Sequence, residues 1–293
     1  MARSTIGLLV LALGMASWAA GRESRAAEAQ PGWPFFALCM DTHDARQRSL
    51  AEQAAMLNEL GYDGAGHLWL DNLSERIRTL DESGLALYQV YMRVDLAKTP
   101  PYDQRLPAVL PLLKGRPTML AVLFYGGKPS DEALDPAAVG ILREIADAAA
   151  RHDLRLVLYP HAQAWLERVE DSLRLIEKCD RPNIGVMFNL CHWLAVDREE
   201  NLEPLLERAK PRLWAVSLNG ADRAAEVQAK TGQWIQPLDQ GTFDVGGLLK
   251  ILRRLDYRGP IGLQCYGIPG DAREHLQRSM AAWRKLSGER DGQ

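Results

Sequence analysis

The chain repeats one pattern eight times: a short apolar run, polar residues at its end, and then a segment with helical spacing. Each unit is about 30 residues long, the length of a strand, a loop and a helix. Strands that alternate with helices are typical of a parallel sheet, and eight such units predict a closed (β/α)₈ TIM barrel. The expected strands are 35–40, 64–68, 85–94, 118–124, 154–158, the first part of 184–192, 213–218 and 261–265.

Helical segments are expected between these strands, beginning with one that Ser49 caps and Gly61 ends. No linker or shift in composition divides the chain, so the pattern predicts a single domain. An open, doubly wound sheet is the alternative, but it would normally carry a Gly-rich phosphate loop after a strand, and none is present. The other expected helices are 73–81, 106–113, 136–150, 165–178, 201–209, 245–255 and 272–286.

The N-terminal residues follow a different pattern. A positive start at Arg3 is followed by an apolar core from Ile6 to Met15 and by small residues suited to cleavage. We therefore predict a signal peptide over residues 1–29 and the barrel over 30–293, with a retained N-terminal anchor as the alternative. Export to the periplasm or the extracellular space would follow. No later segment reaches the roughly 18 apolar residues of a membrane helix, so stable membrane insertion is not expected.

Charge and cysteine usage exclude several classes of protein. A net charge of −3 gives a surface that phosphate backbones do not favour, so we expect no nucleic-acid partner. The four cysteines are scattered, without CxxC or zinc-finger spacing, which is untypical of a disulfide framework. The sequence gives no indication of the oligomeric state.

In a barrel the C-terminal ends of the strands meet at one mouth, where such proteins carry their chemistry. The strand ends of this chain are rich in aromatic, amide, hydroxyl and imidazole groups and poor in carboxylates. Rings that stack on CH faces, beside groups that bond hydroxyls, suit a small carbohydrate ligand. The candidate residues are Asp41, His43, His67, Tyr91, Arg93, Tyr125, Tyr159, His161, Asn189, His192, Ser217, Asn219, Gln264 and Tyr266.

Each candidate also has a simpler explanation. A histidine at a strand end could donate to a nearby carbonyl, and a buried amide could satisfy backbone groups. Arg93 could pair with Asp95 or Asp41. His161 and His192 are the sharpest candidates, because each follows an apolar run and an imidazole can exchange protons near neutral pH.

Four stretches of the second half carry motifs: Leu-Val-Leu-Tyr-Pro-His at 156–161, Gly-Val-Met-Phe-Asn-Leu-Cys-His at 185–192, Val-Ser-Leu-Asn-Gly at 216–220 and Pro-Leu-Asp-Gln-Gly-Thr-Phe-Asp at 237–244. In order and spacing they resemble the xylose isomerase-like barrel superfamily of sugar-phosphate isomerases and epimerases. That family has Glu-x-His, Gly-Val-x-x-Asp-x-x-His, Val-His-x-Lys-Asp and Pro-Leu-Gly-x-Gly-x-x-Asp at these places. The resemblance spans about residues 150–266 and implies the same barrel.

The resemblance also implies a divalent metal, Mn, Mg or Zn, held by Glu, Asp, His and Glu on strands five to eight. The matching positions here are Tyr159, Asn189, Ser217 and Gln264. A phenol, two amides and a hydroxyl cannot neutralise such an ion, so we expect no metal and no other cofactor. His161 and His192 match the histidines of the family motifs, and the family's counterpart of His192 contacts substrate or metal.

Changes from Asp to Asn and from Glu to Gln keep shape and hydrogen bonding while they remove charge. The sequence therefore predicts an exported isomerase- or epimerase-like enzyme that abstracts a proton beside the carbonyl of a sugar or keto-sugar. His192 and His161 would transfer the proton, Tyr159 or Tyr91 would act as acid, and Asp41 would orient the substrate or act as base. The other candidates would bind substrate. A non-catalytic carbohydrate-binding barrel and a keto-sugar lyase or hydratase are the alternatives.

Overall fold

The structure is a computed structural model that describes residues 32–288. Its eight strands pair in parallel and in chain order, and β1 also pairs with β8, which closes the ring. The predicted TIM barrel is confirmed. The predicted signal peptide and its cleavage site lie outside the described residues. The strands are β1 (Phe35–Leu38), β2 (Gly64–Leu68), β3 (Ala86–Asp95), β4 (Met119–Tyr125), β5 (Arg155–Leu158), β6 (Ile184–Asn189), β7 (Leu213–Leu218) and β8 (Ile261–Gln264).

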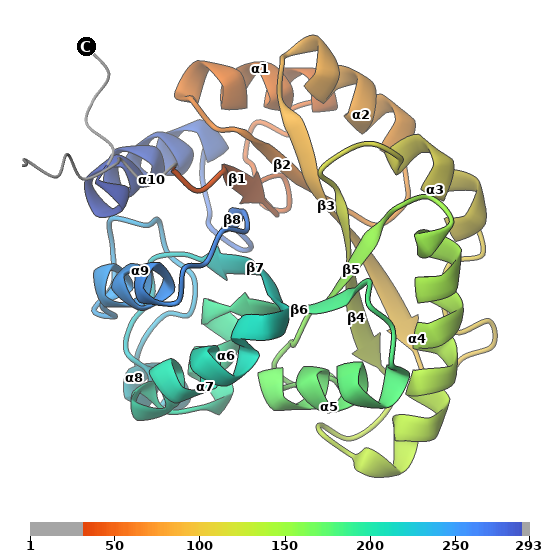
Figure 1. Cartoon of the computed structure of the whole chain (residues 1–293). Helices are drawn as coiled ribbons and strands as arrows, with labels where there is room; N and C mark the ends of the chain where they lie inside the picture. Colours follow the sequence, from red (N-terminus) through yellow and green to blue (C-terminus); the bar gives the residue numbers. More distant parts are fainter. Residues whose placement is uncertain (1–31, 289–293) are drawn as a thin grey trace, which may run out of the picture. The chain divides into compact units, whose positions relative to one another are not determined.

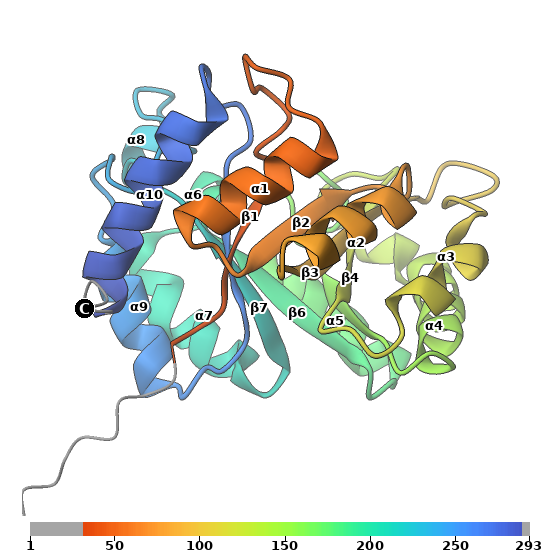
Figure 2. The ribbon, with the colours of Figure 1, turned by 90° about the horizontal axis from the view of Figure 1, so that it is seen from above.

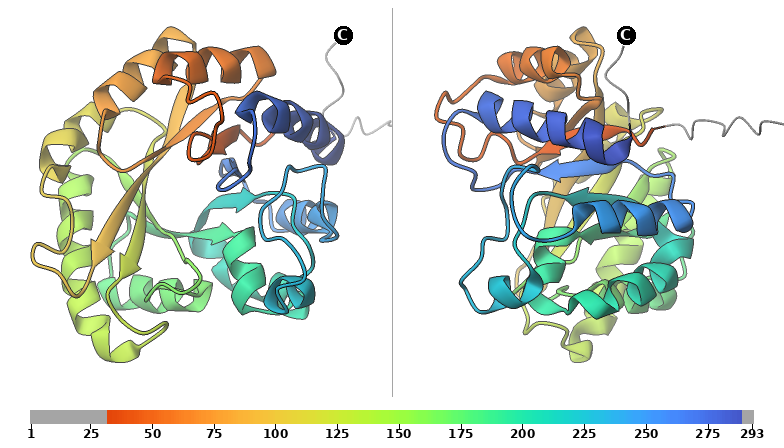
Figure 3. Two further views of the ribbon diagram at one scale, coloured as in Figure 1. Left: turned by 180° about the vertical axis from the view of Figure 1, so that it is seen from behind. Right: turned by 90° about the vertical axis from the view of Figure 1, so that its left-hand side faces the viewer.

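The helices lie around the ring of strands, as Figure 1 shows. Figure 2 shows α1 beside α10 near the place where the ring closes, and Figure 3 shows the same ring from behind and from one side. None of the described helices is long and apolar enough to cross a bilayer. They are α1 (Leu50–Leu60), α2 (Leu73–Glu82), α3 (Leu106–Leu113), α4 (Asp135–Ala150), α5 (Val169–Cys179), α6 (Leu190–Val196), α7 (Leu202–Ala209), α8 (Ala224–Gln228), α9 (Val245–Arg254) and α10 (Ala272–Ser287), with short 3-10 turns at Glu132–Leu134, Glu199–Asn201 and Lys210–Arg212.

Three of these helices differ from the sequence prediction, and one of them, α8, lies where no helix was expected. Helix α5 was expected to begin at residue 165 and begins at Val169, because Trp165 Nε1 donates to the Asp131 carbonyl at 2.8 Å and keeps the preceding residues as a loop. Helix α6 was not predicted. It begins directly after β6, since Leu190 and Leu194 are buried one turn apart, and it places His192 on a helix instead of a strand end.

Side chains of the strands fill two separate layers. The outward-facing residues pack against the helices in one large cluster, and the inward-facing residues form a smaller cluster inside the ring. The interior is therefore a packed core and not a pore. Gly66 and Gly262 supply the inward positions of β2 and β8, where an added Cβ would lie 3.1 and 2.5 Å from side-chain atoms of Leu38. These glycines leave room for bulky neighbours, which are Phe36, Leu38 and Tyr91.

Aromatic packing fastens the seam between the first and last units. The rings of Phe35 and Trp283 stack with centroids 4.1 Å apart and an interplanar angle of 3°. Tyr62 also stacks on Phe35, with ring centroids 5.5 Å apart, and its hydroxyl donates to the Leu276 carbonyl at 2.9 Å. Helix α10 is thereby held against β1, which keeps the ends of β1 and β8 side by side.

Replacing Trp283 with Ala should destabilise the fold by about 3–5 kcal/mol, because it empties a fully buried aromatic site at the seam. Urea unfolding followed by circular dichroism measures this loss. Leu112→Ala is the matched control: Leu112 is 41% exposed, so its loss should change the free energy of unfolding by no more than about 0.5 kcal/mol. Equal effects of the two substitutions would contradict the role given to the seam.

Candidate active site

A pocket of about 380 Å³ opens among the C-terminal ends of the strands. Its volume lies within the roughly 300–1,000 Å³ that small-molecule sites occupy. Aromatic and imidazole rings make up most of its wall, and no charged side chain of the described chain lines it. We call it the reaction pocket. Its lining residues are Cys39, Leu68, Trp69, Tyr91, Leu123, Tyr125, Tyr159, His161, His192, Trp234, Ile235, Gln264 and Tyr266.

Two histidines stack in this pocket although they come from different units. His161 follows β5, His192 lies in the first turn of α6, and their ring centroids are 3.9 Å apart at an angle of 35°. His161 Nδ1 lies 2.8 Å from the Ala162 carbonyl and donates to it, so the neutral ring keeps Nε2 as an acceptor. His192 Nδ1 is buried without a hydrogen-bond partner among the described residues.

Burial sets the charge state of this pair. It lowers the pKa of His192 well below the ordinary value of 6.5, and the neighbouring His161 lowers it further. Burial also lowers the pKa of His161, and the positive charge of Arg93 adds to that effect. Both rings are therefore neutral at pH 7 and can accept a proton, whereas two stacked imidazolium ions would repel each other.

Tyr159 lies beside the histidine pair, with its ring centroid 5.7 Å from that of His192. Its hydroxyl accepts a hydrogen bond from Gln264 Nε2 at 3.2 Å, and burial raises the pKa of Tyr159 well above its ordinary value. Gln264 is held in this orientation because its Oε1 accepts from the backbone N–H of Tyr266 at 3.0 Å. Tyr159 therefore remains protonated, and its own proton can be donated into the pocket.

The three other predicted tyrosines, Tyr91, Tyr125 and Tyr266, also line the pocket. Tyr91 donates its hydroxyl proton to Gln89 Oε1, and its ring meets Tyr159 edge-on at 5.4 Å. Arg93 does not line the pocket but covers the ring of Tyr125, with Cζ 4.0 Å from the ring centroid. Arg93 also lies 4.0 Å from Asp95 and acts on the site as a nearby positive charge.

Six other predicted site residues do not line this pocket, and several of them bond instead to neighbouring groups of the fold. His67 Nε2 donates to the Asp71 carbonyl at 2.7 Å, and its Nδ1 accepts from Arg76, so the ring faces α2. Asn219 donates through Nδ2 to the carbonyls of Gly220 and Trp234, both at 2.7 Å. Asn219 thereby positions Trp234, which does line the pocket. The remaining four are Asp41 and His43, which are exposed, and Asn189 and Ser217, which are buried. His43 Nδ1 accepts from the backbone N–H of Gly267 at 3.2 Å.

The four positions that match the family's metal ligands do not fit a divalent ion. Ser217 Oγ donates to Asn189 Oδ1 at 2.5 Å, and Asn189 Nδ2 donates to the Pro160 carbonyl. Tyr159 and Gln264 are bonded to each other, so the oxygens of both amides already accept hydrogen bonds. Within residues 32–288, no group of three or more His, Cys, Asp or Glu side chains could hold a metal. Neutral, internally bonded groups of this kind are poor ligands for hard cations.

The sequence did not indicate several residues of the pocket wall. Cys39 and Trp69 follow β1 and β2 with φ values of 55° and 67°, a left-handed backbone conformation that is unfavourable for such side chains. Trp234 and Ile235 belong to the long irregular segment after β7, where no periodicity reveals which side chains point inward. No sequence pattern predicts this strained backbone, so it can be recognised only in the structure.

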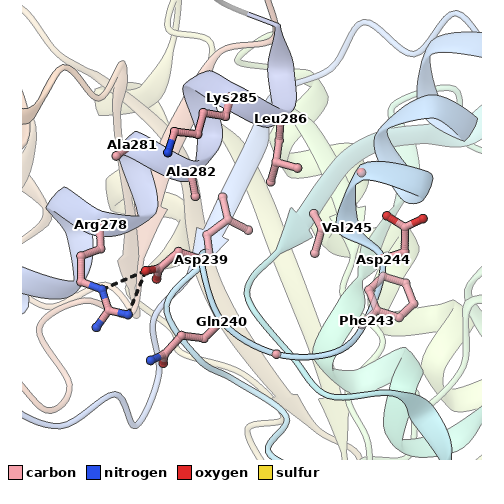
Figure 4. Close-up of a pocket in the computed structure, with 13 residues that line it drawn as sticks. Asp239, Gln240, Phe243, Asp244, Val245, Arg278, Ala281, Ala282, Lys285 and Leu286 are labelled. Atoms are coloured by element: carbon pink, nitrogen blue, oxygen red, sulfur yellow. Dashed lines mark hydrogen bonds and ion pairs between the residues drawn. The ribbon is translucent and has the colours of Figure 1, made fainter.

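A larger hollow of about 500 Å³ lies between the segment 238–246 and α10 (Figure 4). At its edge Arg278 pairs with Asp239 at 2.8 Å. None of the residues at the strand ends lines it, so this hollow is not part of the site that contains the histidine pair.

The structure is a TIM barrel with a pocket at its strand ends, and sequence comparison assigns the chain to a family. The profile of the xylose isomerase-like TIM barrel family matches residues 109–286, and the chain belongs to that family. No curated protein matches the sequence.

Solved structures show the same fold at low sequence identity. The probable 3-DHS dehydratase AsbF of Bacillus anthracis is 15% identical, with a TM-score of 0.68 over 88% of this chain and 99% of that chain. The 3-keto-D-glucoside 4-epimerase YcjR of E. coli is 16% identical, with a TM-score of 0.68 over 86% and 99%. A D-allulose 3-epimerase of Methylomonas sp. in complex with D-allulose is 17% identical, with a TM-score of 0.63 over 88% and 94%.

The purified protein should contain well under one equivalent of Mn, Mg or Zn, because the four positions offer neutral groups that are bonded to one another. Elemental analysis by mass spectrometry measures this, and stoichiometric metal would contradict the expectation. The variant Tyr159→Glu, Asn189→Asp, Ser217→His and Gln264→Glu restores the family's ligand types and should bind Mn²⁺ in calorimetric titration, whereas the wild type should not.

Proposed function

We propose that this chain is a sugar-modifying enzyme that abstracts a proton from the carbon beside the carbonyl of a keto-sugar. The stacked, neutral His161–His192 pair carries the proposal, since it is a buried base in a pocket of sugar size. The likeness to epimerases and a dehydratase supports this reaction class through the shared fold. We also propose a small carbohydrate as ligand and action without a bound metal.

In this mechanism each group of the pocket has a defined part. Nε2 of His161, or the ring of His192, takes the proton, and its stacked partner stays neutral because a second positive charge would be repelled. The hydroxyl of Tyr159 donates to the carbonyl oxygen as negative charge develops there, while Gln264 fixes the direction of that hydroxyl. The aromatic wall excludes water around the reacting atoms.

The stacking also restricts the course of the reaction. Because the two imidazoles lie 3.9 Å apart, both approach the substrate from one side. A proton taken by this pair returns to the same face of the substrate, either on the neighbouring carbon or at a leaving group. This arrangement favours isomerisation or elimination over inversion at one carbon, which needs an acid on the opposite face.

The proposal also includes the location of the protein. We propose export through the segment 1–29, with the barrel acting in the periplasm or the extracellular space.

Two alternative activities fit the same pocket. A keto-sugar lyase or hydratase would use the same proton abstraction and differ in the loss of a neighbouring oxygen. A non-catalytic carbohydrate-binding barrel would keep the aromatic wall but would have no use for a base.

Replacement of His192 with Gln should lower the rate of proton exchange by about 10²–10⁴-fold, because it removes one ring of the base while it keeps the side chain polar. Incubation of aldoses, ketoses and 3-keto-sugars in D₂O, followed by NMR, measures deuterium uptake beside the carbonyl. His152→Gln is the matched control: His152 lies between α4 and β5, at the other end of the strands.

Three outcomes of that experiment separate the alternatives. Exchange that His192→Gln abolishes supports the proposed base. Accumulation of an unsaturated product that absorbs in the ultraviolet assigns an elimination. Sugar binding by the wild type with no exchange for any sugar would contradict the catalytic role and leave the non-catalytic barrel.

The pH dependence follows from the lowered pKa values. Because burial lowers the pKa of both rings, the base persists below pH 6.5, and kcat/KM should fall only at more acidic pH. Arg93→Gln removes a charge that lowers the pKa of His161, so it should move this acid limb toward higher pH. A pH profile of both proteins measures the shift, and an acid limb above pH 6.5 in the wild type would contradict neutral, buried imidazoles.

A further inference from the structure

A second hollow, of about 320 Å³, adjoins the reaction pocket. Ile235 lines both hollows, and Tyr266 of the reaction pocket directly precedes Gly267 of the second one. The two spaces are therefore neighbours along the mouth of the barrel and share one wall. The second hollow is formed by the segments 233–240 and 267–271 and by the first turns of α10.

The wall of the second hollow differs from that of the reaction pocket. Polar side chains predominate, among them Gln233, Gln240 and Glu274, all of which are exposed. Apolar faces come from Ile235 and Pro269. Amides and carboxylates that alternate with apolar surface suit a sugar ring, which presents hydroxyl groups at its edge and CH groups on its faces.

One buried side chain of this wall lacks a partner. His275 is 5% exposed, and its Nδ1 has no hydrogen-bond partner among the described residues. Burial lowers the pKa of His275 to about 4, so its ring is neutral at pH 7 and can bond a hydroxyl without a counter-charge. A buried polar atom without a partner costs free energy, and a ligand hydroxyl would recover that cost if it reached this nitrogen.

The rim between the two hollows carries an exposed aromatic ring. Tyr266 is 54% exposed, and Trp69 at the same mouth is 40% exposed. Apart from Leu112 on α3, these are the large hydrophobic side chains that the described surface exposes. An exposed ring between two hollows can stack on a ligand that extends from one to the other.

From these contacts we infer that the second hollow is a sugar subsite, so that the substrate is a glycoside of at least two rings. The reacting ring lies in the reaction pocket, Tyr266 stacks near the linkage, and the second ring occupies the space beside Ile235 and His275. The inference rests on the proposed function, because it names the substrate class of the same site.

Calorimetric binding of sugars tests the subsite without any need for turnover. The probes are glucose, galactose, mannose and xylose, each beside its α- and β-1,4-linked disaccharides. At least one disaccharide should bind about tenfold more tightly than its monosaccharide, a difference of about 1.4 kcal/mol. Equal affinity for both kinds of sugar, or no binding of either, would overturn the subsite.

Variants then locate the preference for the second ring. Gln240→Ala and Glu274→Ala should each reduce the ratio of disaccharide to monosaccharide affinity, and Tyr266→Ala should do the same from the rim. Gln277→Ala is the matched control: Gln277 is exposed on α10 but lies outside both hollows, so it should keep the wild-type ratio. A preference for disaccharides that none of the first three variants changes would place the second ring elsewhere and overturn the inference.

Binding also separates this inference from the proposed function. His192→Gln should retain the preference for disaccharides, since the second hollow is intact in that variant. A protein that prefers disaccharides but catalyses no deuterium exchange supports the subsite and contradicts the enzyme. A protein that exchanges deuterium but binds monosaccharides equally well supports the enzyme and contradicts the subsite.

Discussion

The position of every group in this site depends on the closure of the ring between β1 and β8. Parallel strands must meet in register at that seam, and the stack of Phe35 on Trp283 holds the last helix against the first strand. Inside the ring, Gly66 and Gly262 have no side chain and therefore leave space for the larger side chains of their neighbours. A closed and filled interior fixes where each strand ends, and therefore where Tyr159 and Gln264 meet at its mouth.

The second constraint is the absence of charge from the wall of the reaction pocket. A carboxylate beside an imidazole stabilises the protonated imidazole and raises the pKa of the ring. The imidazole would then already carry a proton at neutral pH and could not act as a base. The residues that line this pocket include no carboxylate, and burial keeps both His161 and His192 neutral. On the proposed mechanism, the changes from acid to amide at strands six and eight thus have two effects: they remove the ligands of a cation and they leave the imidazoles unprotonated at neutral pH.

The barrel could be predicted because its buried strands are continuous apolar runs with helical segments between them. The same feature limits prediction of the site. Since both faces of such a strand are buried, the sequence does not show which side chains face inward, and His67 points to a helix while Leu68 points to the pocket. Contacts between distant units decide the position of His192 on α6, its stacking on His161 and the place of Trp234 in the pocket wall. No local sequence pattern contains such contacts.

The proposed action without a bound metal also limits which substrates the mechanism can use. A proton leaves the carbon beside a carbonyl only if the negative charge that develops on oxygen is stabilised. In this pocket the stabilising groups are the hydroxyl of Tyr159, whose raised pKa makes it a weak acid, and the dipole of Gln264 behind it. These neutral donors stabilise an oxyanion less than a divalent ion does. The site therefore suits a substrate that already carries a ketone in its ring, where the neighbouring proton is acidic, more than an aldose that must first open.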